Sequence, residues 1–348
     1  MIEPRFPGGT SSAVAGELAV ISRIARPRVH AITSRMFPDG PNAPVIDTAL
    51  DRLGLDMVRD PAHVSADIVV LHNPAFLKFQ DALAVTIAAR RLMVVTHENF
   101  LRPSGQESFD VAGCLAQIAR ASLARERILC PVSAGNRQTV MDWLERAPRE
   151  IAACWTVLED DWFNICDFDI RAPVETPRDR RGRLSRPGFE KFPREEVLEQ
   201  CFAPHARINL LLGADSLMPL ADEHPHWTLL PFRAMEVEAF FEEIDFMVYF
   251  TSDTWRESFG RVLAEAIAAG KVVISDAQTA APFGGGVVAA RPGDVNRLIA
   301  GFVADPDSYR AQVERAQCAL SRYSGAAFEL FFTGSVLSSR PPIGTGAP

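Results

Sequence analysis

Short apolar runs rich in β-branched residues alternate with segments of helical periodicity along this chain, and they form two series. The first series consists of residues 28–34, 67–73, 92–97, 127–133 and 154–159. The second series consists of residues 208–214, 227–232, 245–250, 271–276 and 286–290. Such alternation is typical of βα units that build a mostly parallel sheet. The sequence therefore predicts an α/β fold with two Rossmann-like domains that face a cleft.

A polar stretch separates the two series. Residues 169–188 are rich in proline and arginine and poor in aliphatic side chains, as expected of a linker. We place the domain boundary there, with an N-terminal domain at residues 1–168 and a C-terminal domain at residues 180–322. Beyond them we expect a C-terminal helix at residues 323–333 that returns to the first domain. The remaining residues, 334–348, are rich in Ser, Gly and Pro and predict a disordered tail.

The charge of the chain argues against some partners. The 348 residues include 36 Lys and Arg and 44 Asp and Glu, a formal net charge of −8. Residues 1–150 contain 17 of these basic and 16 of these acidic residues, so the acidity lies in the second half. No basic stripe of the kind that binds nucleic acid occurs, although the pair Arg90–Arg91 could approach an anionic surface. We expect no nucleic-acid partner and at most a weak peripheral contact with a membrane.

Cysteine usage and hydropathy bear on the compartment. The six cysteines form no C-x-x-C pair and no closely spaced Cys/His cluster, so we expect reduced thiols. No apolar run approaches the roughly 18 to 20 residues that a membrane-spanning helix needs, and the N-terminus lacks the hydrophobic region of a signal peptide. The sequence favours a cytoplasmic location, including the inner face of the membrane.

The stretch RESFGRVLAEAIAAGKVVIS, residues 256–275, is typical of an apolar helix followed by a buried strand, yet it contains two carboxylates. Glu257 lies at the expected start of the helix, where free backbone N–H groups attract anions such as a diphosphate. In a regular helix Glu265 would lie about 12 Å further along the axis, comparable with the span from sugar to ribose in a nucleotide sugar. Alternatively, Glu257 only complements the helix dipole. A solvated role fits Glu265 less well, because the helix has no polar face.

The E-x7-E spacing of these glutamates resembles the donor-site motif of retaining glycosyltransferases with the GT-B fold, in particular glycosyltransferase family 4. The resemblance implies an acceptor-side N-terminal domain and a C-terminal domain that binds a nucleotide sugar, with no cofactor and no metal. It implies catalytic roles for His97 and Glu257. The residues that it implies for donor binding are Gly8, Gly9, Arg183, Lys191, Glu257, Ser258, Phe259, Gly260 and Glu265.

A basic segment lies upstream of this motif. GRLSRPGFEK, residues 182–191, looks like the family's segment in which an arginine and a lysine grip the donor diphosphate, here Arg183 and Lys191. A departing diphosphate develops negative charge, and fixed cations can stabilise that charge without a metal. The alternative is a solvated basic linker.

Two N-terminal segments extend the resemblance. FPGGTSSAVAGELAVI is similar to the family's glycine-rich first loop and helix, in which Gly8 and Gly9 permit close backbone approach. His97 directly follows an apolar strand, at the edge where α/β sheets bind ligands, and the family has a histidine there close to the transferred sugar. His72 has the same local context and is a candidate acceptor-site residue. For both histidines the alternative is a structural role.

One departure concerns the first strand. In the family a buried strand precedes the glycine-rich loop, whereas only MIEPRF precedes it here. Either this strand is very short or it is absent. Its absence would favour an inactive relative.

Other chemistries find less support in the sequence. The Asp-x-Asp motif of metal-dependent GT-A enzymes is matched by DFD at 167–169 and by DPD at 305–307. The first lies at the linker, and Asp305 fits a helix cap better. P-loop, serine hydrolase, zincin and dinucleotide-binding motifs do not occur.

These observations predict a metal-independent retaining glycosyltransferase. It would move a sugar from a nucleotide-diphosphate donor to an envelope or extracellular glycan acceptor, including a lipid-linked one. Front-face attack is expected, because no carboxylate is clearly placed as a covalent nucleophile. The alternatives are a catalytically silent GT-B binding or scaffold protein and a nucleotide-sugar epimerase on the same fold.

Overall fold

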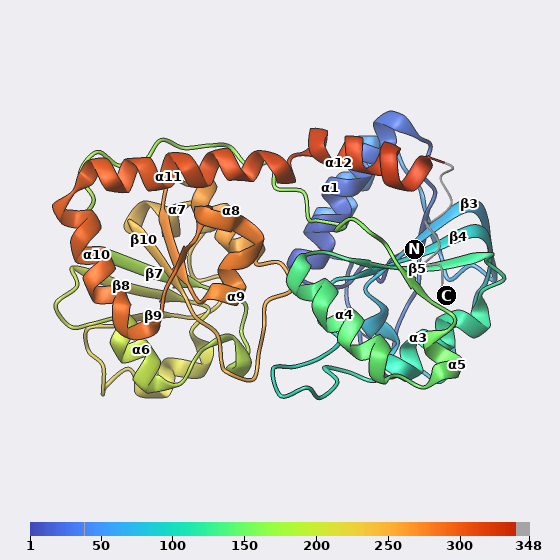
Figure 1. Cartoon of the computed structure of the whole chain (residues 1–348), viewed down its shortest axis with the longest axis horizontal. Coiled ribbons are helices and arrows are strands. Elements are labelled where there is room, and N and C mark those ends of the chain that lie inside the picture. Colours follow the sequence, from blue (N-terminus) through green and yellow to red (C-terminus); the bar gives the residue numbers. More distant parts are fainter. Residues whose placement is uncertain (38, 339–348) are drawn as a thin grey trace, which may run out of the picture.

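The computed structural model describes residues 1–37 and 39–338. Two α/β domains lie side by side (Figure 1), and helices cover the sheet of each one. The helices of the first domain are α1 (Gly9–Ile24), α2 (Pro44–Leu53), α3 (Val111–Ala121), α4 (Ala134–Arg146) and α5 (Arg149–Ala152), with a 3-10 turn η1 (Pro74–Leu77). Its strands are β1 (Val29–Ala31), β2 (Met57–Arg59), β3 (His63–His72), β4 (Thr86–Thr96), β5 (Glu126–Pro131) and β6 (Thr156–Val157).

Met1 and Ile2 connect the two parallel sheets of the first domain. Ile2 forms a parallel bridge with Ala31 beside β1, and the carbonyl of Met1 accepts a hydrogen bond from the His72 amide at the end of β3. These residues therefore continue the order β2-β1 into β3-β4-β5-β6. The strand expected before the glycine-rich loop is thus limited to these residues. A very short strand was one of the two predicted alternatives.

The second domain follows the same plan. Its strands are β7 (Arg180–Leu184), β8 (Ile208–Leu212), β9 (Thr228–Leu230), β10 (Phe246–Tyr249), β11 (Val272–Ser275) and β12 (Val288–Ala289). Its helices are α6 (Glu195–Cys201), α7 (Val237–Glu243), α8 (Arg261–Ala268), α9 (Ala277–Ala280), α10 (Val295–Ala304) and α11 (Pro306–Leu320), with 3-10 turns η2 (Phe189–Lys191), η3 (Asp215–Leu220), η4 (Ala281–Gly286), η5 (Pro292–Asp294) and η6 (Ser321–Tyr323). The strands are all parallel, and in the order β12-β11-β10-β7-β8-β9 the direction in which the chain adds strands reverses between β7 and β10, the point where open α/β sheets bind ligands.

The linker assignment was wrong for residues 180–184, which form the central strand β7. Their polarity concealed the strand because the buried Arg181 is neutralised locally, with its Nε 2.7 Å from Asp179. Gly182 allows the sheet to approach α7, since an added Cβ would lie 2.6 Å from Ile244. Glycine and paired arginines thus take the place of the apolar residues expected in a buried strand.

The C-terminal segment returns to the first domain. Helix α12 (Gly325–Phe331) continues as a π-helix, η7 (Phe332–Leu337), and α12 packs against α1 (Figure 1). Residues 334–337, expected to be disordered, are therefore helical, and residues 339–348 lie outside the described part of the chain. Arg91 is buried here and donates hydrogen bonds to the carbonyls of Val336 and Ser338, so it is not the surface cation that we expected.

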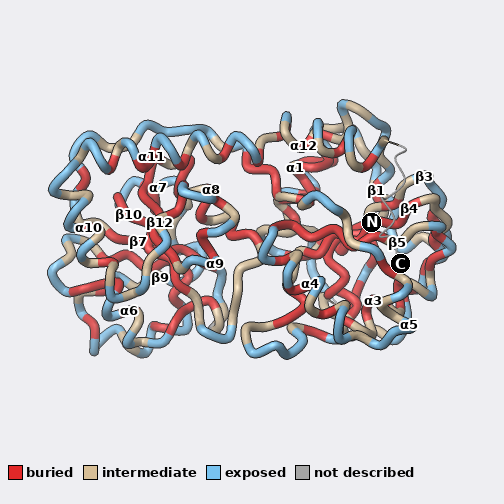
Figure 2. The backbone as a smooth tube through the Cα atoms, in the orientation of Figure 1, coloured by how far each residue is buried: buried red, intermediate tan, exposed pale blue. Residues whose placement is uncertain are grey.

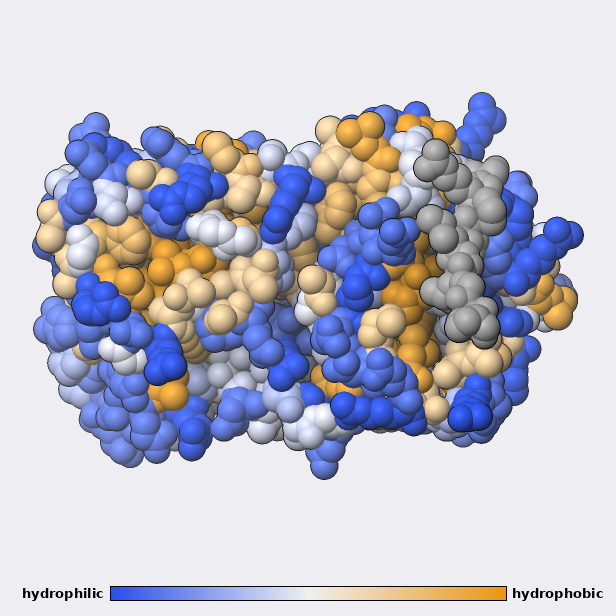
Figure 3. All heavy atoms as spheres, viewed as in Figure 1, coloured by the Kyte–Doolittle hydropathy of each residue, from blue (hydrophilic) through white to orange (hydrophobic). Residues whose placement is uncertain are grey.

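Burial follows the sheets of both domains (Figure 2). In the view of Figure 3, hydrophilic residues cover much of the rim, and hydrophobic residues reach the surface mainly over the middle of each domain. Within the described ranges, no helix is both long and apolar enough to cross a bilayer.

Candidate functional site

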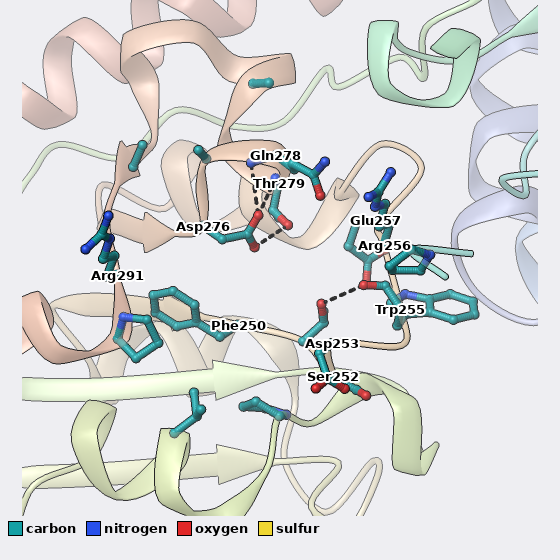
Figure 4. Close-up of a pocket in the computed structure, with 18 of the residues that line it drawn as sticks. Phe250, Ser252, Asp253, Trp255, Arg256, Glu257, Asp276, Gln278, Thr279 and Arg291 are labelled. Carbon is teal, nitrogen blue, oxygen red and sulfur yellow. Dashed lines mark hydrogen bonds between the residues drawn. The ribbon is translucent and has the colours of Figure 1, made fainter. Parts of the chain in front are cut away.

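A cavity of about 780 Å³ lies between the two domains at the carboxyl ends of the second sheet. The first domain contributes Asn99 and Gln138, and the second contributes the segments after β10, β11 and β12. Figure 4 shows the charged and polar groups around it, with Glu257 and Arg256 on one side, Asp276 and Thr279 on another and Arg291 at a third. The cavity is therefore shared by both domains and lined by groups of both signs.

Glu257 lies on the wall of this cavity. It accepts hydrogen bonds from the Nζ of Lys191 at 2.6 Å and from the hydroxyl of Tyr249 at 2.7 Å. Burial alone would raise the pKa of Glu257, but the ion pair with Lys191, these hydrogen bonds and the charge of Arg183 together lower it. Lys191 also lies 4.5 Å from the ring centroid of Trp255. The predicted residues Lys191 and Glu257 are therefore brought together as an ion pair.

Arg183 lies behind the cavity wall, and its side chain has no exposed surface. Its guanidinium is enclosed by the rings of Phe192 and Tyr249, at 4.2 and 4.5 Å from their centroids. It donates hydrogen bonds to the carbonyls of Phe250 and Lys191, and burial lowers its pKa. The expectation that Arg183 faces the donor directly is not met in this arrangement. It holds the backbone that carries the wall.

The helix expected to begin near Glu257 begins at Arg261 instead. Gly260 precedes it with φ at 85°, a left-handed conformation that ends the preceding loop and that favours glycine. Glu257 is thus in a loop, and the predicted spacing along one regular helix was wrong. Glu265 lies in the helix, where its Oε1 accepts a hydrogen bond from Arg261 Nε at 3.1 Å. Burial raises the pKa of Glu265, and Arg261 opposes this effect.

The loop between Glu257 and α8 also contacts the first domain. The carbonyl of Ser258 accepts a hydrogen bond from the hydroxyl of Ser133, which caps α4. Phe259 is buried in the core that both domains share, beside Tyr323. Ser258 and Phe259 therefore hold the domains together rather than line the cavity.

Arg186 is a cation that the sequence analysis missed. It belongs to the loop after β7, and its side chain crosses the glycine-rich loop of the first domain, because a Cβ added to Gly8 would lie 3.1 Å from Arg186 Cδ. Gly8 has φ at 77°, and helix α1 begins at Gly9, where an added Cβ would meet no atom within 4 Å. Of the two predicted glycines, Gly8 thus lies against Arg186 of the other domain, and Gly9 does not. The second arginine of GRLSRP was the signal that could have identified it.

His72 and His97 lie at the carboxyl edge of the first sheet, because β3 and β4 are parallel neighbours. The Nδ1 of His72 is 3.2 Å from the Nε2 of His97. Glu17 of α1 approaches the other side of His72, with Oε2 at 3.6 Å from Nε2. The sequence analysis missed Glu17 because a lone glutamate in an apolar helix carries no motif.

Burial shifts the pKa of all three groups in this cluster. It raises the pKa of Glu17 to about 8 and lowers that of His97 to about 4. Burial and the neighbouring His97 lower the pKa of His72 well below its ordinary value. Both histidines are therefore neutral near pH 7.

Two clusters place three potential metal-binding atoms within 4.8 Å of one another, namely Glu17, His72 and His97, and Glu195, Glu199 and His224. In the first, the shortest contacts of His72 with its two neighbours use different ring nitrogens. In the second, Glu195 already pairs with His224 at 2.6 Å. The Asp-x-Asp residues serve as caps, since Asp167 accepts hydrogen bonds from the Gly325 amide at the start of α12, and Asp305 caps α11.

Comparisons with known proteins agree with this architecture at the level of fold. No family model matches the chain, and no curated protein matches it significantly. HepE of Anabaena, solved in complex with UDP and glucose, is similar with a TM-score of 0.61 and 15% identity, over 97% of this chain and 98% of that one. A trehalose-6-phosphate synthase studied for glycosyl transfer with retention gives 0.57 and 12%, over 95% and 97%. WaaG, a glycosyltransferase involved in lipopolysaccharide biosynthesis, gives 0.54 and 12%, over 95% and 98%.

Proposed function

The chain has the GT-B fold, and we propose that it is a retaining glycosyltransferase. It moves a sugar from a nucleotide-diphosphate donor to an envelope or extracellular glycan acceptor, without a metal. HepE with UDP and glucose supports the donor class, and WaaG supports an envelope glycan as acceptor. The trehalose-6-phosphate synthase supports retention.

The observation that carries this proposal is the shared cavity with Glu257 at its wall and Lys191 paired with that carboxylate. A diphosphate bound beside Lys191 replaces Glu257 as the anionic partner of the ammonium group. The cation therefore stays paired while negative charge builds on the leaving group. The carboxylate of Glu257 is then free to accept hydrogen bonds from sugar hydroxyls. Arg186 adds a second cation beside the backbone of Gly8.

The remaining predicted residues take supporting roles in this proposal. Glu265 binds the ribose after it exchanges the hydrogen bond from Arg261. His97 contacts the transferred sugar, and His72 lies on the acceptor side. In the reaction, the acceptor oxygen bonds to the anomeric carbon on the face from which the diphosphate departs, and a phosphate oxygen takes the hydroxyl proton.

A catalytically silent binding protein on the same fold is the second candidate. It is favoured by the same ion pair, because Lys191 and Glu257 satisfy each other without a ligand. It is also favoured by Arg183, which is enclosed in the second domain.

A thermal-stability screen followed by a turnover assay tests these candidates. A nucleoside diphosphate at 100 times its dissociation constant should stabilise the fold by about 2.7 kcal/mol, which the free nucleoside should not do at equal concentration. Donor hydrolysis should then persist in a chelator. If no nucleoside diphosphate raises the melting temperature, the proposal fails. Binding without turnover identifies the silent protein, and turnover that needs added Mn²⁺ or Mg²⁺ contradicts metal independence.

A further inference from the structure

The shortest contacts among Glu17, His72 and His97 connect the three side chains in a row. His72 lies in the middle, with its Nδ1 3.2 Å from His97 Nε2 and its Nε2 3.6 Å from Glu17 Oε2. The second distance is slightly too long for a hydrogen bond, so a continuous chain of hydrogen bonds requires Glu17 to move slightly towards His72. The three residues come from α1, from the end of β3 and from the residue after β4.

Glu17 is an unusual group for the interior of a helix. Its side chain is 2% exposed, and neither carboxylate oxygen has a hydrogen bond to a described residue. The indole N–H of Trp162 lies near the carboxylate and opposes the rise in its pKa, although the pair does not reach hydrogen-bond geometry. A carboxylate with unfilled hydrogen-bonding capacity in the interior is costly, so Trp162 and His72 are the neighbours that would relieve this cost.

The protonation state of Glu17 sets both histidine tautomers through this chain. A protonated Glu17 donates to His72 Nε2, so the His72 proton is on Nδ1 and is donated to His97 Nε2. His97 then carries its own proton on Nδ1. An ionised Glu17 accepts from His72 Nε2, which reverses both tautomers and leaves His97 Nδ1 as an acceptor. No described residue forms a hydrogen bond with that Nδ1.

We propose that Glu17 is a positioning residue that sets, through His72, whether His97 Nδ1 donates or accepts a hydrogen bond toward the bound sugar. The part that concerns the sugar rests on the proposed function. The coupling between Glu17 and the two histidines does not rest on the proposed function, because it requires only these three side chains.

The surroundings of Glu17 leave it as the group that titrates near neutral pH. The groups that face it are His72 from β3, His97 after β4, Cys130 on β5 and the amino group of Met1. Burial lowers the pKa of the Met1 amino group to about 5 and raises that of the Cys130 thiol. Both histidines are neutral above pH 7. A change of tautomer between pH 6 and 10 therefore reports Glu17.

The test is a pH series of two-bond ¹H–¹⁵N spectra on the full chain with ¹⁵N-labelled histidines, which distinguishes protonated from unprotonated ring nitrogens. In the wild type, the ring proton should be on Nδ1 of both histidines at low pH and on Nε2 of both at high pH. The two changes should share a midpoint near pH 8. Glu17→Gln should keep the low-pH tautomers throughout, because its amide N–H donates to His72 as the acid does. Glu145→Gln, at an exposed position of α4, should leave the midpoint unchanged, and the exposed His63 serves as an internal reference.

The wild-type series decides the proposal even if Glu17→Gln fails to fold. Tautomers that stay constant between pH 6 and 10, or that change one histidine without the other, overturn it. Zinc found bound to both histidines in the purified protein also overturns it. A coupled exchange in a protein that binds no nucleoside diphosphate supports the chain of hydrogen bonds and rejects the proposed function.

Discussion

Two carboxylates of this chain lie in opposite environments, although each is largely removed from water. Glu257 is paired with Lys191 and accepts a second hydrogen bond from Tyr249, which lowers its pKa despite burial. Glu17 has no comparable partner, and burial raises its pKa to about 8. The first is ionised at neutral pH and the second is largely protonated. Replacing each carboxyl group by a neutral amide should therefore have opposite effects on stability.

The ion pair of Lys191 and Glu257 should stabilise the fold as a unit. The side chains are only 10% and 14% exposed, so Lys191→Met leaves a carboxylate poorly solvated and should cost about 2 to 4 kcal/mol. The double variant Lys191→Met/Glu257→Gln removes both charges and should cost less than the sum of the single variants. Urea denaturation of the four proteins measures the coupling. Strictly additive losses would show that the pair is not coupled.

The buried Glu17 should make the stability of the fold depend on pH. The folded carboxyl keeps its proton up to about pH 8, whereas the unfolded one loses it near 4.5. Its contribution to stability is therefore complete below about pH 4.5 and is lost as the pH rises through 8. Glu17→Gln stays neutral, so its free energy of unfolding relative to the wild type should rise by on the order of 3 kcal/mol between pH 5 and 9. Chemical denaturation at both pH values measures this difference, and Glu145→Gln serves as the control. The prediction is wrong if Glu17→Gln and the wild type differ in free energy of unfolding by the same amount at pH 5 and pH 9.

At the scale of elements, the two series of apolar runs located the strands well. Each run of the second series overlaps one of the strands β8 to β12, because buried parallel strands are apolar on both faces. Strand β7 does not follow this rule, since Arg181 and Arg183 are buried with polar partners, Asp179 and the carbonyl of Phe250, that periodicity does not reveal. The start of α8 was also misplaced, because a glycine such as Gly260 can lie within a helix or end a loop, and the sequence alone does not decide which.

Among the site residues, the sequence located those that belong to a motif. It identified Lys191 and Glu257, which the fold brings into contact from segments far apart in the chain. It could not foresee that Arg183 faces inward, since orientation depends on the packing of Phe192 and Tyr249 around it. Glu17 was missed because it is a lone glutamate of an apolar helix, and the histidines near it follow two strands distant in the sequence.

The left-handed conformation of Gly260 should make it intolerant of a side chain. A Cβ there would meet Leu263 at 3.4 Å, which is ordinary contact, so the cost comes from φ rather than from a clash. Gly260→Ala should lose about 1 to 3 kcal/mol of stability. Gly9→Ala is the matched control, because an added Cβ meets no atom within 4 Å in the first turn of α1, and it should be neutral or slightly stabilising. Equal losses in chemical denaturation would reject the conformational explanation.

At the scale of the molecule, the chain connects the two domains twice and joins them across the cleft. It crosses between them before β7 and again where α11 leads into α12 (Figure 1). Near the cavity, the Asn99 amide donates to the carbonyl of Arg256 at 3.1 Å, and Ser133 donates to that of Ser258. These polar contacts lie beside the apolar core around Phe259 that both domains share, so the domains are joined by both kinds of contact.

We expect the domains to be more open in the free protein and to close on a nucleoside diphosphate. The reason is that Arg186 of the second domain lies over Gly8 of the first. A diphosphate bound between the domains would attract both this cation and the free N–H groups at the start of α1, and would so draw the domains together. Small-angle scattering should show a decrease in the radius of gyration when the nucleotide is added. Uridine, which lacks the diphosphate, should produce no decrease.

The variants Arg186→Ala and Arg207→Ala distinguish this mechanism from general charge screening. Both remove one exposed arginine of the second domain, but only Arg186 reaches the glycine-rich loop. At saturating nucleotide, Arg207→Ala should compact as the wild type does and Arg186→Ala should remain open. A wild type whose scattering is unchanged by ligand would exclude closure, and compaction of Arg186→Ala to the wild-type radius would show that the cation does not drive it.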